Sequence, residues 1–145
     1  MFIKQTVKER TRSGKVPLHF CAESGSVQCL DLVLSMEPFL VNTQDEEGYT
    51  PLHLAVINGN KDAVRRLVTA GADLNCLDNE KHSLVHWATV CGEVEILNLL
   101  LSNGAPASTP DIHLAHPIHY AAQMCGTVNG VSGGSRARFK ALSMA

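Results

Sequence analysis

The sequence predicts an all-α solenoid, in which helical units of one kind stack along a single axis. The first observation is a motif centred on a histidine, most complete at residues 50–55 (TPLHLA), whose four copies place the histidines 34, 33 and 33 residues apart. The second is that aspartates and glycines recur in phase with this motif. A period of this length indicates that one supersecondary unit is stacked on itself.

The residues that recur in phase mark equivalent places in each unit. Copies of the motif lie at residues 17–22, 51–55, 84–88 and 117–122. Aspartates precede three copies and glycines follow the expected helices, at Asp45, Asp78, Asp111, Gly25, Gly59, Gly92, Gly71 and Gly104. The T-P-L-H-x-A pattern with a period of 33 resembles the ankyrin repeat. The resemblance covers residues 14–126 and implies helix-turn-helix units joined by β-hairpin loops.

The expected organisation has three full repeats and part of a fourth. We place a basic leader that can form a short helix at 1–13, repeats at about 14–44, 45–77 and 78–110, a partial repeat at 111–126, and a flexible, basic Gly/Ser-rich tail at 127–145. A hydrophobic fraction of 45% with 18% charged residues is typical of one globular domain. Without a run of about eighteen apolar residues or a secretory leader, we expect a soluble chain, not inserted in a membrane, in the cytoplasm or the nucleus.

Repeat 1 should have its first helix at residues 17–24 and an apolar second helix that begins near Val27. Its exit reads Met36-Glu37-Pro38-Phe39, where the later repeats carry a glycine. The left-handed turn that glycine favours is therefore missing, and Pro38 should stop the helix instead.

Repeat 2 is the most regular repeat. Gly48 permits a positive φ at the hairpin tip, Thr50 can cap the first helix, and Pro51 suits the first helical position. The second helix carries apolar residues on one face and basic residues on the other, namely Ala63, Val64, Leu67 and Val68 against Lys61, Arg65 and Arg66. These features make repeat 2 the expected centre of stability.

Repeats 3 and 4 lack some of the residues that stabilise the loop and the helix start in repeat 2. Lys81 takes the place of the hairpin glycine in repeat 3, and a left-handed lysine costs about 1 kcal/mol, so we expect an altered or looser hairpin. Leu114 takes that place in repeat 4, whose first helix should begin at Pro117. Because no further repeat follows, we expect the outer surface of repeat 4 to leave Tyr120 and Met124 partly uncovered.

The five cysteines, at positions 21, 29, 76, 91 and 125, include no C-x-x-C pair. Several of them fall on helical segments of the repeat. We therefore interpret them as small, mostly buried residues in the reduced state, rather than as a disulfide framework.

Charge is unevenly distributed along the chain. Residues 1–15 carry five Lys/Arg against one Glu, residues 16–126 carry four against thirteen Asp/Glu, and residues 127–145 carry three and none. An acidic repeat body repels phosphate backbones, which makes nucleic acid an unsuitable partner. It favours a basic segment of another protein.

The histidines do not predict catalysis or metal binding. The resemblance implies that the periodic ones, His19, His53, His86 and His119, are structural residues that tie adjacent loops together. His113 and His116, near Cys125, belong to a hairpin tip and a helix entrance, so their side chains should diverge rather than form a metal site. No phosphate-binding loop or nucleophile arrangement is present, so we expect no cofactor and no enzymatic activity.

The resemblance implies a contact surface made of hairpin tips and the inner faces of the first helices. Transferred by phase, the expected partner-binding residues are Glu46, Glu47, Tyr49, Ile57, Asn58, Asn79, Glu80, His82, Val90, Ile112, His113 and Met124. We expect Tyr49, Ile57, Val90 and Met124 to be the apolar anchors. Trp87 should instead fill the core between repeats.

The leading hypothesis is a non-catalytic protein–protein interaction module, a monomer that acts as scaffold or adaptor. In this view the chain is a fragment or truncated isoform of a larger signalling, regulatory or channel protein. The alternative hypothesis is a small ankyrin-type inhibitor that occludes an enzyme or a transcription factor.

Overall fold

A computed structural model of the chain describes residues 10–126, of which residues 124–126 are described by their backbone only. The leader helix and the flexible tail that the sequence suggests lie outside these residues. The elements in chain order are the α-helices α2 (Pro17–Ser24) and α3 (Val27–Met36), the 3₁₀-helix η1 (Pro38–Asn42), and the α-helices α4 (Pro51–Ile57), α5 (Lys61–Thr69), α6 (Leu84–Cys91), α7 (Val94–Ser102) and α8 (Pro117–Gly126).

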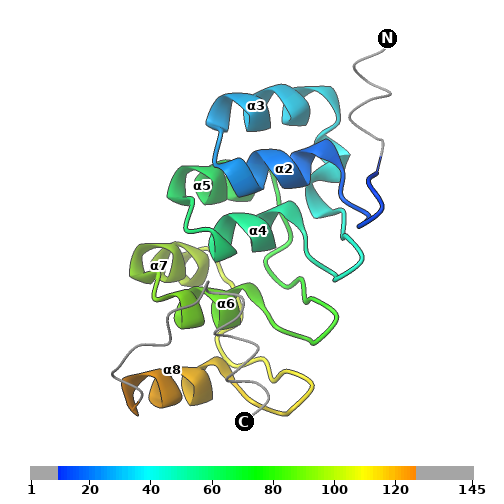
Figure 1. Ribbon diagram of the computed structural model, residues 1–145. Helices are drawn as coiled ribbons and strands as arrows, with labels where there is room; N and C mark the ends of the chain where they lie inside the picture. The colour runs from blue at the N-terminus through cyan, green and yellow to red at the C-terminus, as the bar shows by residue number, and fades with distance from the viewer. Residues whose placement is uncertain (1–9, 127–145) are drawn as a thin grey trace.

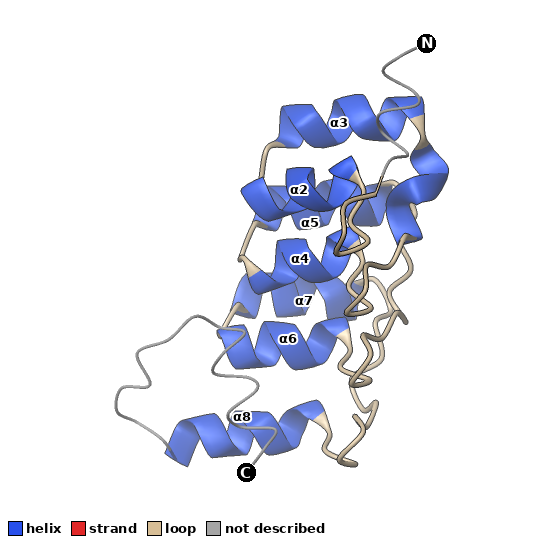
Figure 2. Cartoon of the chain, turned by 45° about the vertical axis from the view of Figure 1, so that its right-hand side comes forward, coloured by secondary structure: helices blue, strands red, loops and turns tan. Residues whose placement is uncertain are grey.

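The helices form two layers of one stack, which confirms the predicted all-α solenoid. The first helices α2, α4, α6 and α8 pack side by side in one layer, and α3, α5 and α7 form the second layer behind them (Figure 1). The loops that join one repeat to the next all project from the same end of the helices, and the short turns within each repeat lie at the other end (Figure 2). Within residues 10–126 the β structure is limited to an isolated bridge between Leu77 and Ser83, so these loops are tight turns rather than paired strands.

The helix boundaries follow from local chemistry. The Thr50 hydroxyl accepts a hydrogen bond from the His53 N–H at 3.2 Å, and Ser83 does the same for His86 at 3.2 Å, as N-caps should. At the exit of repeat 1, α3 ends at Met36 and η1 begins at Pro38, which confirms the predicted stop. No helix in the described part has both the length and the apolar character needed to cross a membrane.

The hairpin of repeat 3 is not looser than its neighbours, so that expectation is wrong. Lys81 adopts the left-handed conformation, with φ of 61°, and its N–H still donates to the Asp78 carbonyl at 2.9 Å. Gly48, with φ of 84°, makes the equivalent turn in repeat 2. The Asp78 carboxylate also accepts from two backbone N–H groups of the turn, and these bonds offset the cost of the left-handed lysine.

The core runs through the stack between the two layers. Trp87 is buried, as predicted. Tyr120 is also buried, so the expectation that it is partly uncovered is wrong. The large apolar residue exposed on the described part of α8 is instead Ile118.

Cys21 and Cys29 form a disulfide that links α2 to α3, which contradicts the expected reduced state. The turn between these helices brings residues eight positions apart to a Cα–Cα distance of 5.6 Å, within the range for a disulfide. The assignment from repeat position alone missed this, because it placed each cysteine on its helix but did not consider how closely the two helices face each other.

Reduction of the disulfide is expected to lower the free energy of unfolding by about 2–3 kcal/mol, since the crosslink restricts the unfolded chain. Urea unfolding with and without reductant measures this difference. The Cys29→Ser variant is the control and should lose the sensitivity to reductant. If alkylation of the denatured, unreduced protein modifies both Cys21 and Cys29, the bond is not present.

Candidate functional site

The loops between repeats are built on one aspartate each. The Asp45 Oδ1 accepts hydrogen bonds from the N–H groups of Glu47 and Tyr49, both at 2.9 Å. Asp78 and Asp111 repeat this arrangement with the residues two and four positions after them, at 2.8–3.0 Å. A carboxylate that bonds the backbone of its own turn fixes the loop conformation. The three loop tips therefore present their side chains in the same way.

Backbone hydrogen bonds join neighbouring loops into one edge. The Glu46 N–H donates to the Ser13 carbonyl at 2.9 Å, and the Asn79 N–H donates to the Glu47 carbonyl at 3.0 Å. The Ile112 N–H donates in turn to the Glu80 carbonyl at 3.1 Å. A ligand that contacts one loop therefore meets a surface whose spacing is set by the whole stack.

The periodic histidines His19, His53 and His86 form a ladder along the stack, which confirms the predicted structural role for these three. Within the described residues His119 makes only the bond to its own repeat. The Nδ1 of His19, of His53 and of His86 accepts from the N–H of the helix N-cap residue at 3.1–3.3 Å, so Nε2 carries the proton. Nε2 then donates to a loop carbonyl of the next repeat, at 2.9 Å to Tyr49, 3.4 Å to His82 and 3.0 Å to Ala115.

Burial keeps the ladder histidines neutral. It lowers the pKa of His53 to about 4, even though Asp78 favours the charged form. It also lowers the pKa of His19 and His86 below the ordinary value of 6.5. An imidazolium has no acceptor nitrogen, so a charged histidine would lose the bond from the N-cap N–H.

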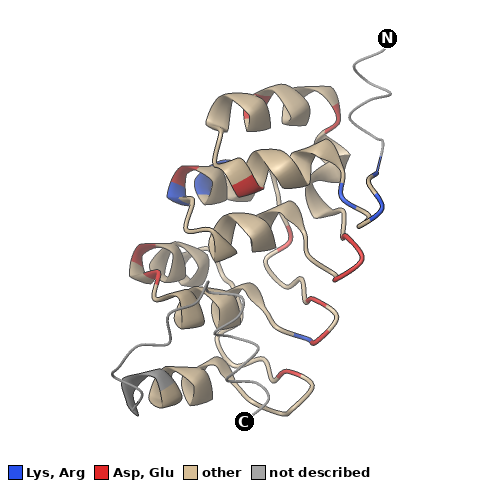
Figure 3. Ribbon diagram, viewed as in Figure 1, with Lys and Arg blue, Asp and Glu red and all other residues tan. Residues whose placement is uncertain are grey.

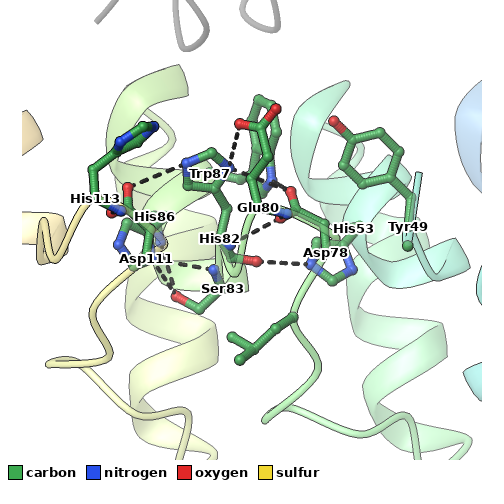
Figure 4. A network of polar contacts seen from close by, with 12 residues as sticks. Tyr49, His53, Asp78, Glu80, His82, Ser83, His86, Trp87, Asp111 and His113 are labelled. Carbon is green, nitrogen blue, oxygen red and sulfur yellow. Dashed lines mark hydrogen bonds and ion pairs between the residues drawn. The ribbon is translucent and has the colours of Figure 1, made fainter. Parts of the chain in front are cut away.

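A buried polar network connects repeats 3 and 4 (Figure 4). The imidazole of His82 lies between two carboxylates, with Nδ1 3.5 Å from Asp78 Oδ2 and Nε2 3.2 Å from Asp111 Oδ2. The Trp87 Nε1–H donates to Asp78 Oδ2 at 3.1 Å, and the Tyr120 hydroxyl donates to Asp111 Oδ2. The large side chains of Trp87 in α6 and Tyr120 in α8 are thereby bonded to the aspartates of the loops.

The network sets the ionisation of its acids. Burial alone would raise the pKa of Asp78, but hydrogen bonds and the proximity of His82 outweigh it, and the pKa lies below the ordinary value. Asp111 behaves in the same way, because Tyr120 and backbone N–H groups outweigh burial and lower its pKa. Burial and the Asp111 carboxylate both raise the pKa of Tyr120. Asp78 and Asp111 are therefore held in the ionised form, and the Tyr120 hydroxyl is held in the protonated form.

The structure separates the expected contact residues into two groups. Six of them are exposed, namely Glu46, Glu47, Asn58, Asn79, Ile112 and His113, and Glu80 is half-buried. Four are buried, namely Tyr49, Ile57, Val90 and His82, so their expected exposure is wrong. Met124 is described by its backbone only. Of the four expected anchors, none is therefore shown at the surface.

The buried positions are explained by packing between adjacent repeats. Tyr49 is 4% exposed because its ring meets the edge of Trp87 in the next repeat, with ring centroids 5.8 Å apart. Ile57 and Val90 lie in the last turns of α4 and α6, which pack side by side. His82 is enclosed by Asp78 and Asp111. Transfer by phase located these positions but ignored the size of the side chains in the neighbouring repeat.

Part of this surface is an acidic edge, which we define as the exposed Glu46, Glu47 and Asn79 and the half-buried Glu80 (Figure 3). Asn79 links the two loops, because its side-chain amide donates to the Glu46 carbonyl at 2.6 Å. An open hollow of about 250 Å³ lies between these loops and is lined by Glu47, Tyr49, Asp78, Asn79 and Glu80. The edge thus offers carboxylates beside a small concavity.

The arrangement offers little for catalysis or metal binding. In the described ranges no three His, Cys, Asp or Glu side chains lie together in a way that could hold a metal ion. The His116 Nδ1 bonds the Ser108 carbonyl at 2.8 Å, whereas His119 Nδ1 accepts from the His116 N–H at 2.8 Å. Burial raises the pKa of the Cys76 thiol to about 11, which makes it a poor nucleophile.

Sequence reasoning missed two features of this surface. One is the burial of His82 within the carboxylate network. The recurrence of Asp78 and Asp111 in phase, each nine residues before a large aromatic residue, could have indicated it. The other is the identity of the side chains that repeat 4 leaves uncovered. The sequence predicted an uncovered outer surface but assigned it to Tyr120 and Met124, whereas the exposed large apolar residues of this repeat include Leu114 and Ile118.

Comparison with known proteins agrees with this architecture. A family model described as "Ankyrin repeats (3 copies)" matches residues 2–78 and 18–111. A 60-residue segment is 42% identical to ankyrin repeat domain-containing protein 49 of Bos taurus and covers 41% of this chain and 25% of that protein. A 68-residue match is 34% identical to protein phosphatase 1 regulatory subunit 27 of Homo sapiens and covers 47% of this chain and 44% of that protein.

A third relative, "Probable 26S proteasome regulatory subunit p28" of Saccharomyces cerevisiae, is 34% identical over 76 residues, which cover 52% of this chain and 33% of that protein. The matched segments thus span less than half the length of each of these relatives. The family model, in contrast, matches well over half of this chain. Together with the stacked helix pairs and the histidine ladder, this match shows that the chain belongs to the ankyrin repeat family.

Proposed function

We propose that the chain is a non-catalytic protein-interaction module that uses the acidic edge to bind a basic, extended segment of a partner protein. The observation that carries the proposal is the edge itself: loops locked by aspartates and by backbone bonds between repeats hold the carboxylates at a fixed spacing. A preformed surface loses little conformational entropy when a ligand binds.

The distribution of charge supports a basic partner. Glu46 and Glu47 are exposed at one loop tip, and Glu80 lies at the next. The exposed cations of α5 lie on another side of the stack and pair with acids of the same helix layer, as in Arg66–Asp31 at 3.5 Å and Lys61–Glu95 at 2.8 Å. The carboxylates of the edge are therefore not neutralised by those cations. Lys81 is exposed in the same loop as Glu80, so the two loop tips carry three glutamates against one cation (Figure 3).

The relatives support a regulatory rather than a catalytic role. Two of the proteins that this chain resembles are named as regulatory subunits, one of a phosphatase and one of the proteasome. We infer that this chain serves as an adaptor or scaffold of the same general class.

Reversal of the edge charge, with Glu46, Glu47 and Glu80 all changed to lysine, is expected to slow association with a Lys/Arg-rich peptide by about tenfold or more, because electrostatic steering changes sign. Surface plasmon resonance with synthetic peptides of graded net charge measures the association rate. For the wild type, the rate should fall as salt is raised from about 50 to about 300 mM.

The matched control changes three acids of the second helices, Asp31, Asp62 and Glu95, to lysine. This variant has the same net charge as the edge variant, but its changes lie on the other helix layer. It should keep most of the association rate. Equal losses in the two variants, or equal binding of acidic and basic peptides by the wild type, would contradict the proposal.

A further inference from the structure

The described residues expose one apolar face at each end of the stack. At the second helical position, Leu18, Leu52 and Val85 are buried, whereas Ile118 in the last repeat is 72% exposed. This position is therefore the one that the following repeat covers. The exposed Ile118 marks a stacking face that no described residue covers.

The first repeat shows the complementary face. Two residues further along the helix, Leu54, Trp87 and Tyr120 are buried, whereas Phe20 in the first repeat is 46% exposed. This position is therefore the one that the preceding repeat covers. Because all repeats share one geometry, the face exposed at the C-terminal end of the stack is shaped to receive the face exposed at the N-terminal end.

The polar groups at the two ends match in the same register. The ladder histidines donate to the carbonyls of Tyr49, His82 and Ala115, each in the loop of the next repeat. Lys15 occupies the equivalent position in the first loop. The Lys15 carbonyl accepts the Thr11 N–H at 2.9 Å, as the Tyr49 carbonyl accepts the Asp45 N–H. His119 is the ladder histidine of the last repeat, and it is exposed, with Nδ1 bonded as in the others.

The backbone edge shows the same correspondence. Along the stack, the N–H of one loop donates to a carbonyl of the loop before it. Arg12 occupies the donor position in the first loop, and His113 occupies the acceptor position in the last loop. Within residues 10–126, neither the Arg12 N–H nor the His113 carbonyl takes part in a backbone bond of this kind. Both therefore remain available for a neighbour.

Charge favours the same pairing. Residues 10–15 carry three cations, Arg10, Arg12 and Lys15, and no acid. Residues 78–126 carry five acids and a single lysine. The N-terminal end of one copy is thus attracted to the C-terminal half of another, whereas two C-terminal ends repel each other.

We propose that a second copy of this chain docks on the C-terminal stacking face through its own N-terminal face, so that the solenoid continues from one molecule into the next. In this contact Phe20 of one copy packs beside Ile118 of the other, and His119 Nε2 donates to the Lys15 carbonyl. The contact is heterologous and leaves a free end on every assembly. It differs from the monomer that the sequence suggests.

The proposal has a distinctive test by light scattering on the full chain over a series of concentrations. The average mass of the wild type should rise with concentration above the 15.6 kDa of one chain, without stopping at a dimer. Phe20→Asp and Ile118→Asp should each remain at 15.6 kDa. An equimolar mixture of the two should form a species of twice that mass and nothing larger, because only one pair of intact faces remains.

The control is Phe39→Asp, at an exposed apolar residue in η1, an element that contacts α3 and α4. It should assemble like the wild type. A wild type that stays at 15.6 kDa at every concentration would overturn the proposal and leave the chain's own terminal segments as occupants of the faces. Dimers of Phe20→Asp alone would also overturn it, since they would show that two C-terminal ends pair. Recovery of the dimer on mixing shows that both variants are folded.

Discussion

Replacement of Asp78 by alanine is expected to lower the free energy of unfolding by about 3–5 kcal/mol, because it removes one member of a buried charged network. Its carboxylate accepts from the N–H groups of Glu80 and His82 and from the indole of Trp87. It also lies 3.5 Å from the imidazole of His82. Alanine would take these acceptors away from groups that stay buried. Urea denaturation followed by far-UV circular dichroism measures the loss.

Asp45→Ala is the matched control, because Asp45 makes the same turn in repeat 2 but contacts no indole or imidazole at hydrogen-bond distance. It is also half-buried rather than buried. We expect this variant to lose about 1–2 kcal/mol, as for an ordinary cap of backbone groups. Equal losses at Asp45 and Asp78 would show that the network between repeats 3 and 4 contributes nothing beyond the turn.

These two aspartates illustrate what the sequence could predict. Both occur in phase with the repeat, and the period alone indicated that they lead equivalent loops. The start of α4 at Pro51, the cap at Thr50 and the role of His53 were predictable for the same reason, because local chemistry within one repeat decides them. Interactions within one repeat can therefore be predicted from a single copy of the motif.

The errors concern contacts between repeats. Tyr49 was expected at the surface because of its phase, but its burial depends on Trp87, which lies 38 positions later in the chain. His82 is buried because acids of two different loops enclose it. Equivalent positions, such as Tyr49, His82 and Ala115, carry side chains of different sizes. A repeat pattern therefore predicts where a residue lies but not what the neighbouring repeat places against it.

Acidification is expected to destabilise the protein progressively from about pH 6.5 to about pH 4, by on the order of 3 kcal/mol from His53 alone. In the unfolded chain the histidine titrates near its ordinary pKa of 6.5, whereas burial lowers the pKa of folded His53 to about 4. Between these values the unfolded state binds a proton that the folded state does not, so stability falls as pH falls. The lowered pKa values of His19 and His86 act in the same direction.

Urea denaturation at a series of pH values measures this dependence, and two histidine variants separate its source. His53→Gln should be less stable than the wild type at neutral pH, because it loses the bonds of the ladder, but its stability should fall less steeply below pH 6.5. His113→Gln, at an exposed loop tip outside the ladder, is the matched histidine control. Stability that stays constant between about pH 6.5 and pH 4.5 would contradict the neutral ladder.

At still lower pH, Asp78 and Asp111 take up protons through their own lowered pKa values, so the loss continues with the same sign. The stack therefore depends on the neutral form of its histidines and the charged form of its loop aspartates, and both are lost toward acid.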